Sequence, residues 1–139
     1  MIVVDTSFIY ALLDRADTRH QEAASWYARA AAALATTPLV LAETDHLAGA
    51  RVGEAALRAF RQDVAAGAYE VDWWPTAAAE SVVAAERYRD LGLGLTDASL
   101  VALAARLETT LVATFDERHF RAVKPLTNEP AFTILPADE

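Results

Sequence analysis

Apolar residues fall into short runs that predict β-strands, separated by longer stretches with helical spacing. Ile2–Val4 is a β-branched run, and Leu39–Leu41 is a second apolar run that follows Pro38. Segments at 69–73, 110–114 and 132–135 are apolar or alternate between apolar and polar residues, which predicts three more strands. The pattern therefore indicates short strands spread over the whole chain.

Helical periodicity fills most of the intervals between these runs. Residues 8–13, 43–52 and 76–91 are predicted to be helical. A capping box at 18–21 predicts the start of another helix, whose apolar face carries Ala23, Trp26, Tyr27, Ala30 and Leu34. Two further helices place apolar residues at core spacing, one at Leu57, Phe60 and Val64, the other at Leu100, Leu103, Ala104 and Leu107.

Strands that alternate with helices in this way form a parallel sheet with helices on both faces. The chain has 139 residues, which suits one domain, and no linker, repeat or low-complexity tract divides it. We therefore expect residues 1–139 to form a single three-layer α/β domain.

Composition and charge narrow the class of protein. The chain contains no cysteine, which excludes disulfides and thiolate zinc sites and fits a reducing cytoplasm. No apolar stretch reaches the roughly 20 residues of a membrane span, and the N-terminus lacks the features of a signal peptide. The net charge of −8 argues against nonspecific coating of nucleic acid, which is typical of basic proteins. We expect a cytoplasmic protein without membrane association, and the charge still allows an enzyme that holds a short RNA through metal ions and arginines.

Three carboxylates follow predicted strands, and a fourth begins a predicted helix. Asp5, Glu43 and Asp116 lie at or just past the carboxyl ends of their strands, where open α/β sheets bind ligands. Asp97 opens a helix, where the helix dipole favours a negative charge. If this helix directs its N-terminus to the same edge of the sheet, the four carboxylates converge.

Converging carboxylates repel one another unless a cation neutralises them. Mg²⁺ and Mn²⁺ prefer such hard oxygen ligands, and one or two of these ions suit phosphodiester hydrolysis. The hydroxyls of Thr6, Ser7 and Thr114 lie close to the acids in sequence and are candidates for orienting carboxylates or waters. Each acid alone is also explained as a helix cap or first-turn residue, but independent caps need not gather at one edge.

Other polar residues are given weaker roles. Arg51, Arg58 and Arg61 are candidates for binding RNA phosphates, and a solvated helix face explains them equally well. Asp45 follows Glu43 by two residues, about 200° around a helix, and is expected to point away from the acids. The three histidines, His20, His46 and His119, show no metal-ligand spacing and are interpreted as surface or capping residues.

Four segments resemble, in order, the acid-bearing segments of PIN domains. They are Val3–Ser7 with the first acid, Ala42–Glu43 with the second, Leu95–Ala98 with the third and Ala113–Phe120 with the fourth. The resemblance covers nearly the whole chain. As a stand-alone domain of this length, the sequence is most similar to VapC-type toxins of type II toxin–antitoxin systems.

This resemblance implies a three-layer α/β/α fold and an endoribonuclease that depends on Mg²⁺ or Mn²⁺. It implies that Asp5, Glu43, Asp97 and Asp116 hold the metal and carry catalysis. It also implies a homodimer that is silenced by a cognate antitoxin. Given the net charge of −8, we expect the antitoxin to use a basic C-terminal segment, with an arginine among the carboxylates and an amphipathic helix in a groove between helices.

Several alternatives stay open at this point. A receiver-like signalling domain is also acidic and binds Mg²⁺, and Lys124–Pro125 fits its late lysine–proline pair, but Asp5 lacks an acidic neighbour. A phosphatase of the haloacid type needs a second acid where this chain has Ser7. An inactive acidic binding module and a PIN nuclease that processes RNA without a toxin role are the other two.

Overall fold

The computed structural model describes all 139 residues and contains one five-stranded sheet. The strands are β1 (Ile2–Val4), β2 (Leu34–Thr36), β3 (Glu70–Val71), β4 (Leu111–Ala113) and β5 (Thr133–Leu135). They lie in the order β3-β2-β1-β4-β5, and every neighbouring pair is parallel. The carboxyl ends of all five strands therefore meet at one edge, as the alternation of strands and helices predicts.

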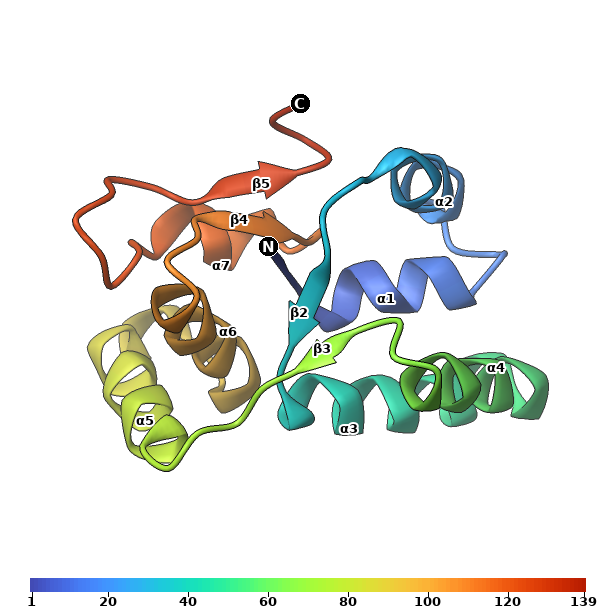
Figure 1. The fold of residues 1–139 in the computed structure, drawn as a ribbon, viewed down its shortest axis with the longest axis horizontal. Coiled ribbons are helices and arrows are strands. Elements are labelled where there is room, and N and C mark those ends of the chain that lie inside the picture. The colour runs from blue at the N-terminus through green and yellow to red at the C-terminus, as the bar shows by residue number, and fades with distance from the viewer.

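Helices flank the sheet (Figure 1). They are α1 (Thr6–Leu13), α2 (His20–Arg29), α3 (Pro38–Leu47), α4 (Glu54–Ala65), α5 (Ala77–Arg87), α6 (Leu95–Arg106) and α7 (Glu117–Ala122). Helices α1 to α4 gather on one side of the molecule, and α5 and α6 pack together on the other, with α7 beside β4 and β5. This arrangement confirms the three-layer α/β fold. None of these helices is both long and apolar enough to cross a membrane.

The core lies between the layers. The three residues of β1 are buried, and the stretch 98–104 of α6 is buried without a break. A strand covered on both faces loses the alternation of apolar and polar positions, which explains why β1 is continuously apolar. The same burial fixes α6 against the sheet, so that the start of this helix has a defined position at the carboxyl edge.

The second strand was predicted in the wrong place. It is Leu34–Thr36, which pairs with β1, whereas Leu39–Leu41 belongs to the first turn of α3. Pro38 occupies the first turn of this helix, where its missing N–H costs nothing, and the Thr37 side chain caps it by accepting a hydrogen bond from the Val40 N–H. The face assigned to α2 is therefore wrong at Ala30 and Leu34, because the helix already ends at Arg29. It is also wrong at Tyr27, whose side chain is exposed, whereas Ala23 and Trp26 are buried as predicted.

The predicted capping box at 18–21 is also absent. Arg19 precedes α2, and no side chain caps the helix. The turn before it is held by other bonds, since the Ala16 N–H donates to Asp14 and the Arg19 N–H donates to Asp17. The remaining predicted elements are present with shifted ends, and the short helix α7 was not predicted.

Candidate active site

A pocket of about 430 Å³ opens at the carboxyl edge of the sheet. Its walls come from the ends of β1 and β4, the start of α6 and one side of α3. The lining residues include all four predicted acids, Asp5, Glu43, Asp97 and Asp116. The sequence-predicted convergence is therefore present in the structure.

Asp5 is the most enclosed of these carboxylates. It ends β1 and caps α1, and its side chain accepts hydrogen bonds from the Thr6 N–H at 2.7 Å, the Ser7 hydroxyl at 2.8 Å and the Thr114 hydroxyl at 2.7 Å. Burial raises the pKa of Asp5, while these three bonds act in the opposite direction. The bonds fix the direction of a carboxylate that would otherwise be costly to bury.

The hydroxyls around Asp5 form a connected set. Ser7 Oγ lies 3.2 Å from Thr114 Oγ1, and it also accepts a hydrogen bond from the Phe115 N–H at 2.9 Å. The expected positioning role of Ser7 and Thr114 thus has a structural basis. Thr6 differs, because its hydroxyl is buried at the pocket wall and has no hydrogen-bond partner in the protein.

Asp97 lies in the first turn of α6, after Gly94. Its side chain is 18% exposed. Burial, followed by the charges of Asp5 and Asp116, raises the pKa of Asp97 to about 7, while His119 lowers it and Glu43 adds a small increase. The raised pKa of Asp97 therefore reflects its burial first and the nearby negative charges second.

Asp116 caps α7 and is held by two backbone contacts. Its side chain accepts a hydrogen bond from the His119 N–H at 3.3 Å, and its own N–H donates to Thr114 Oγ1 at 2.9 Å. Thr114 thereby connects Asp116 with Asp5. The cap and the pocket position are compatible, so a capping role does not compete with a functional one.

Glu43 reaches the pocket by a different route from the one predicted. It does not follow a strand, because it lies on the second turn of α3, and its side chain is exposed. Helix α3 packs against α1 and α6, which brings Glu43 to the pocket wall and close enough to affect Asp97. Glu43 thus lies at the pocket, as expected, but the structural reason given for its position was wrong.

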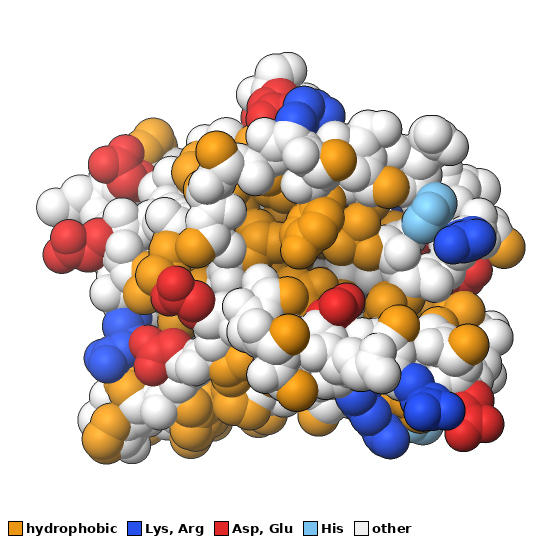
Figure 2. All heavy atoms as spheres, turned by 45° about the vertical axis from the view of Figure 1, so that its right-hand side comes forward, with side chains coloured by type: hydrophobic (Ala, Val, Ile, Leu, Met, Phe, Trp, Pro, Cys, Tyr) orange, Lys and Arg blue, Asp and Glu red, His pale blue; other side chains and the backbone are white.

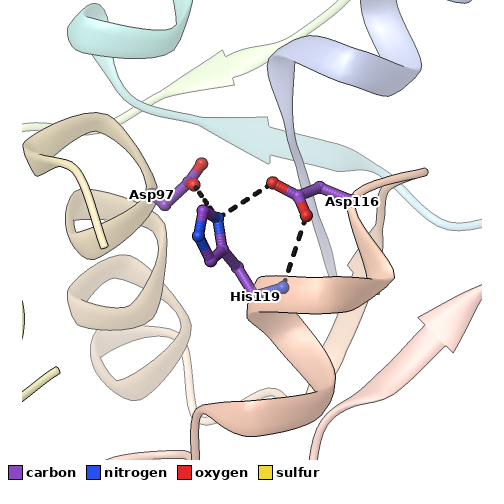
Figure 3. A group of neighbouring side chains, drawn as sticks. All are labelled: Asp97, Asp116 and His119. Atoms are coloured by element: carbon purple, nitrogen blue, oxygen red, sulfur yellow. Dashed lines mark hydrogen bonds and ion pairs between the residues drawn. The ribbon is translucent and has the colours of Figure 1, made fainter. Parts of the chain in front are cut away.

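His119 belongs to this site, although it was predicted to be a surface or capping residue. Its Nδ1 lies 3.2 Å from Asp97 Oδ2 and 3.0 Å from Asp116 Oδ2, and its Nε2 lies 3.2 Å from the Leu91 carbonyl (Figure 3). The side chain is only 11% exposed. The available signal was the spacing of three residues after Asp116, which places both side chains on one face of a helix.

Only one of the three arginines predicted to bind RNA phosphates lines the pocket. Arg51 lines the pocket, whereas Arg58 is exposed on α4 and does not. Arg61 makes two hydrogen bonds to Asp45, at 2.7 and 3.0 Å, outside the pocket. Asp45 therefore points away from the acids, as expected. Arg19 lines the pocket and was missed, because a turn residue carries no periodic signal.

This donor set suits a divalent cation with a preference for oxygen ligands. Carboxylate oxygens of Asp97 and Asp116 and a ring nitrogen of His119 lie within 4.8 Å of one another. The carboxylate of Asp5 is held in place beside them by the hydroxyls of Ser7 and Thr114. Such a cluster can hold a divalent cation, which would compensate the negative charge of the carboxylates and attract an anionic substrate.

Comparison with known proteins gives one consistent family. The family model described as "PIN domain" matches residues 2–125. Over 138 residues the chain is 36% identical to ribonuclease VapC26 of Mycobacterium tuberculosis, covering 97% of this chain and all of that protein.

Two solved structures share the fold. VapC20 of Mycobacterium tuberculosis, described as a sarcin–ricin loop cleaving toxin, superposes with a TM-score of 0.79 at 24% identity, over 84% of this chain and 91% of that one. FitAcB of Neisseria gonorrhoeae superposes with a TM-score of 0.59 at 19% identity, over 86% and 91%. Both likenesses concern the arrangement of the sheet and helices.

Proposed function

Because the chain belongs to the PIN-domain family, we propose that it is a Mg²⁺- or Mn²⁺-dependent endoribonuclease and the toxin of a toxin–antitoxin pair. The observation that carries the proposal is the convergence of four carboxylates in one pocket, where burial and the neighbouring charges together raise the pKa of Asp97. Membership of this family removes the receiver-like and haloacid phosphatase alternatives. The full-length similarity to a ribonuclease supports the activity.

The residues that would hold the cation are Asp5, Glu43, Asp97 and Asp116, with His119 beside Asp97 and Asp116. When bound, a divalent cation supplies the positive charge that attracts a phosphate and favours the attack of water on phosphorus. Oxygen donors predominate in this set, which fits Mg²⁺ or Mn²⁺.

The protein's own groups prepare the site for this chemistry. Ser7 and Thr114 donate to one oxygen of Asp5, so this carboxylate keeps one orientation without the help of a ligand. His119 contacts Asp97 and Asp116 together and keeps their oxygens close. Such preorganisation places charge before the substrate arrives, which is the main source of electrostatic catalysis.

The partner follows from the similarity to VapC proteins and from the surface. On the side formed by α1 and α4, Figure 2 shows a hollow lined by apolar side chains. A groove between the end of α1 and the start of α4 is lined by the apolar residues Leu12, Leu13, Val52, Ala55, Ala56 and Ala59, together with three acids. We infer that an antitoxin lays an amphipathic helix in this groove and extends a basic C-terminal segment to the carboxylates of the pocket. The proposal includes a homodimeric toxin.

The test is cleavage of labelled RNA by the purified chain, with Mg²⁺, with Mn²⁺ and with a chelator. We expect cleavage only with metal, and a loss of about 100-fold or more in Asp97→Asn. Glu129→Gln is the matched control, because Glu129 lies beside Glu108 and Thr110, away from the pocket, and it should keep full activity. Equal cleavage with chelator, or by Asp97→Asn, would refute the metal site.

Expression in a bacterial host tests the toxin role separately. We expect growth arrest from the wild-type chain, rescue by co-expression of the neighbouring reading frame, and no arrest from Asp5→Asn. Active cleavage in vitro without growth arrest would favour an RNA-processing nuclease instead.

A further inference from the structure

The wall of the pocket carries an arginine side chain whose role the carboxylate site does not explain. Five carboxylates and two arginines, Arg19 and Arg51, line the pocket. A polyanionic substrate must approach these carboxylates, and a cation in the core of the site compensates only part of their charge. A fixed positive group at the pocket wall is therefore needed where the next phosphate of the strand lies.

The guanidinium of Arg19 lies over an aromatic ring. Its guanidinium carbon lies 4.7 Å from the centre of the Phe115 ring. Phe115 in turn stacks on Phe8, with ring centres 5.5 Å apart and planes 23° apart, and the fully buried Phe8 packs edge-on against Trp26 at 5.2 Å. The platform beneath the guanidinium is thus anchored in the core, and an arginine stacked on it loses less freedom when it binds a ligand.

The platform is also connected to the carboxylates. Phe115 immediately precedes Asp116, and its N–H donates to Ser7 Oγ, which in turn donates to Asp5. The position of the ring is therefore tied to the same hydroxyl that orients Asp5.

The guanidinium keeps most of its donors available. Its one ion pair is with Glu22 at 3.6 Å, and both side chains are 45% exposed, so this contact is weak. No hydrogen bond joins the Arg19 guanidinium to any other group of the protein. A hydrogen bond within the turn that carries Arg19 restrains its backbone, because the Arg19 N–H donates to the Asp17 side chain at 2.8 Å.

We propose that Arg19, stacked on Phe115, binds the phosphate next to the scissile one in a single-stranded RNA and so sets the register of the strand over the carboxylates. This proposal rests on the proposed ribonuclease function. A guanidinium presents parallel N–H donors that match two phosphate oxygens, and single-stranded RNA can bring a phosphate and an unstacked base to such a platform. Arg19 would therefore act on binding and register, while the carboxylates act on the scissile bond.

Cleavage kinetics give the first test. In Arg19→Gln we expect KM to rise about tenfold or more, as the loss of a charged hydrogen bond implies, with kcat changed far less. The dependence of log kcat/KM on log salt concentration should flatten by about 0.7, the value for one phosphate on a single strand. Arg19→Lys should recover the salt slope but only part of KM. Phe115→Leu, which keeps an apolar contact with Phe8, should raise KM several-fold.

Arg29→Gln is the matched control, because Arg29 is 58% exposed, pairs with Glu139 and does not line the pocket.

A direct binding assay separates this proposal from the ribonuclease function. In the Asp97→Asn background with Mg²⁺, a fluorescent single-stranded RNA should bind about tenfold more weakly when Arg19→Gln is added, and with unchanged affinity when Arg29→Gln is added. This comparison stands even if the wild-type chain fails to cleave RNA. Equal affinity and equal salt slope for the Arg19 and Arg29 variants would overturn the proposal.

Discussion

The sharpest test of the carboxylate cluster is the stability of the metal-free protein when Asp97 is replaced by Asn. The substitution keeps the size and polarity of the side chain and removes its charge. In the folded protein, burial and neighbouring charges raise the pKa of Asp97 from 3.8 to about 7. An acid whose pKa is raised by folding holds its proton more tightly in the folded state, so the free energy of unfolding falls as pH rises between these two values.

The size of the effect follows from the two pKa values. Each pKa unit corresponds to about 1.4 kcal/mol, so the ionised Asp97 destabilises the metal-free fold by about 4 kcal/mol at pH 8. At pH 5 the folded form keeps its proton while the unfolded form has largely lost it, and the same linkage gives about 2 kcal/mol. Asp97→Asn should therefore be more stable than wild type by these amounts, with the gain growing towards alkaline pH.

Urea denaturation in the presence of a chelator, at pH 5 and pH 8, measures both differences. Glu129→Gln serves as the control, since this exposed loop acid should leave stability nearly unchanged at both values. Asp5→Asn should behave differently from Asp97→Asn, because the Asp5 carboxylate accepts three hydrogen bonds that its amide replaces only in part. A stability gain for Asp97→Asn that does not depend on pH, or a loss of stability, would refute the claim that burial and neighbouring charges oppose the ionisation of Asp97.

Three further predictions concern the same site. Millimolar Mg²⁺ or Mn²⁺ should raise the melting temperature of the wild type, because a metal at a hundredfold excess over its dissociation constant stabilises the folded state by about 2.7 kcal/mol. The rise in melting temperature should be smaller in Asp97→Asn, and a melting temperature that does not change with metal contradicts the site. Thr114→Val removes the hydroxyl that joins Asp5 to Asp116 and should cost about 1–3 kcal/mol in urea denaturation, whereas Thr114→Ser should cost less. His119→Phe fills the same space without contacting the two aspartates, and Mn²⁺ affinity followed by thermal shift should fall about 10–100-fold; unchanged affinity would show that His119 only packs.

The acids that were predicted for the right reason are those whose position depends on local signals. Asp5 ends a β-branched run, and Asp97 follows a glycine-containing loop at the start of an apolar helix. Both signals lie within a few residues of the acid itself. The parallel sheet then converts local signals into a shared location, since all its strands end at the same edge.

The errors arose where a short segment competes with its neighbours. Strand β2 has only three residues and follows a run of alanines, so its pattern is weaker than that of the apolar first turn of α3. The Thr37 cap and the proline after it start helix α3 at this point. In the sequence analysis Pro38 was instead interpreted as the boundary before a strand. His119 was missed because α7 is only six residues long, too short to show a period.

Other features depend on contacts between distant segments. Arg19 and Phe115 are separated by most of the chain, and no spacing rule links them. Glu43 enters the pocket only because α3 packs on α1 and α6. Contacts of this kind can be identified only from the folded structure, because they depend on how the helices pack around the core.

The hydrogen bond between Thr114 and Asp5 spans 109 residues of sequence, and this separation has a consequence for the timing of activity during synthesis. Strand β1 leaves the ribosome first, but its partner β4 and the acid after it emerge when most of the chain has been made. Closing so long a loop is slow and depends on the intervening helices being in place. A nascent chain therefore carries Asp5 without the groups that orient it, and the carboxylate pocket is complete only when synthesis is nearly finished.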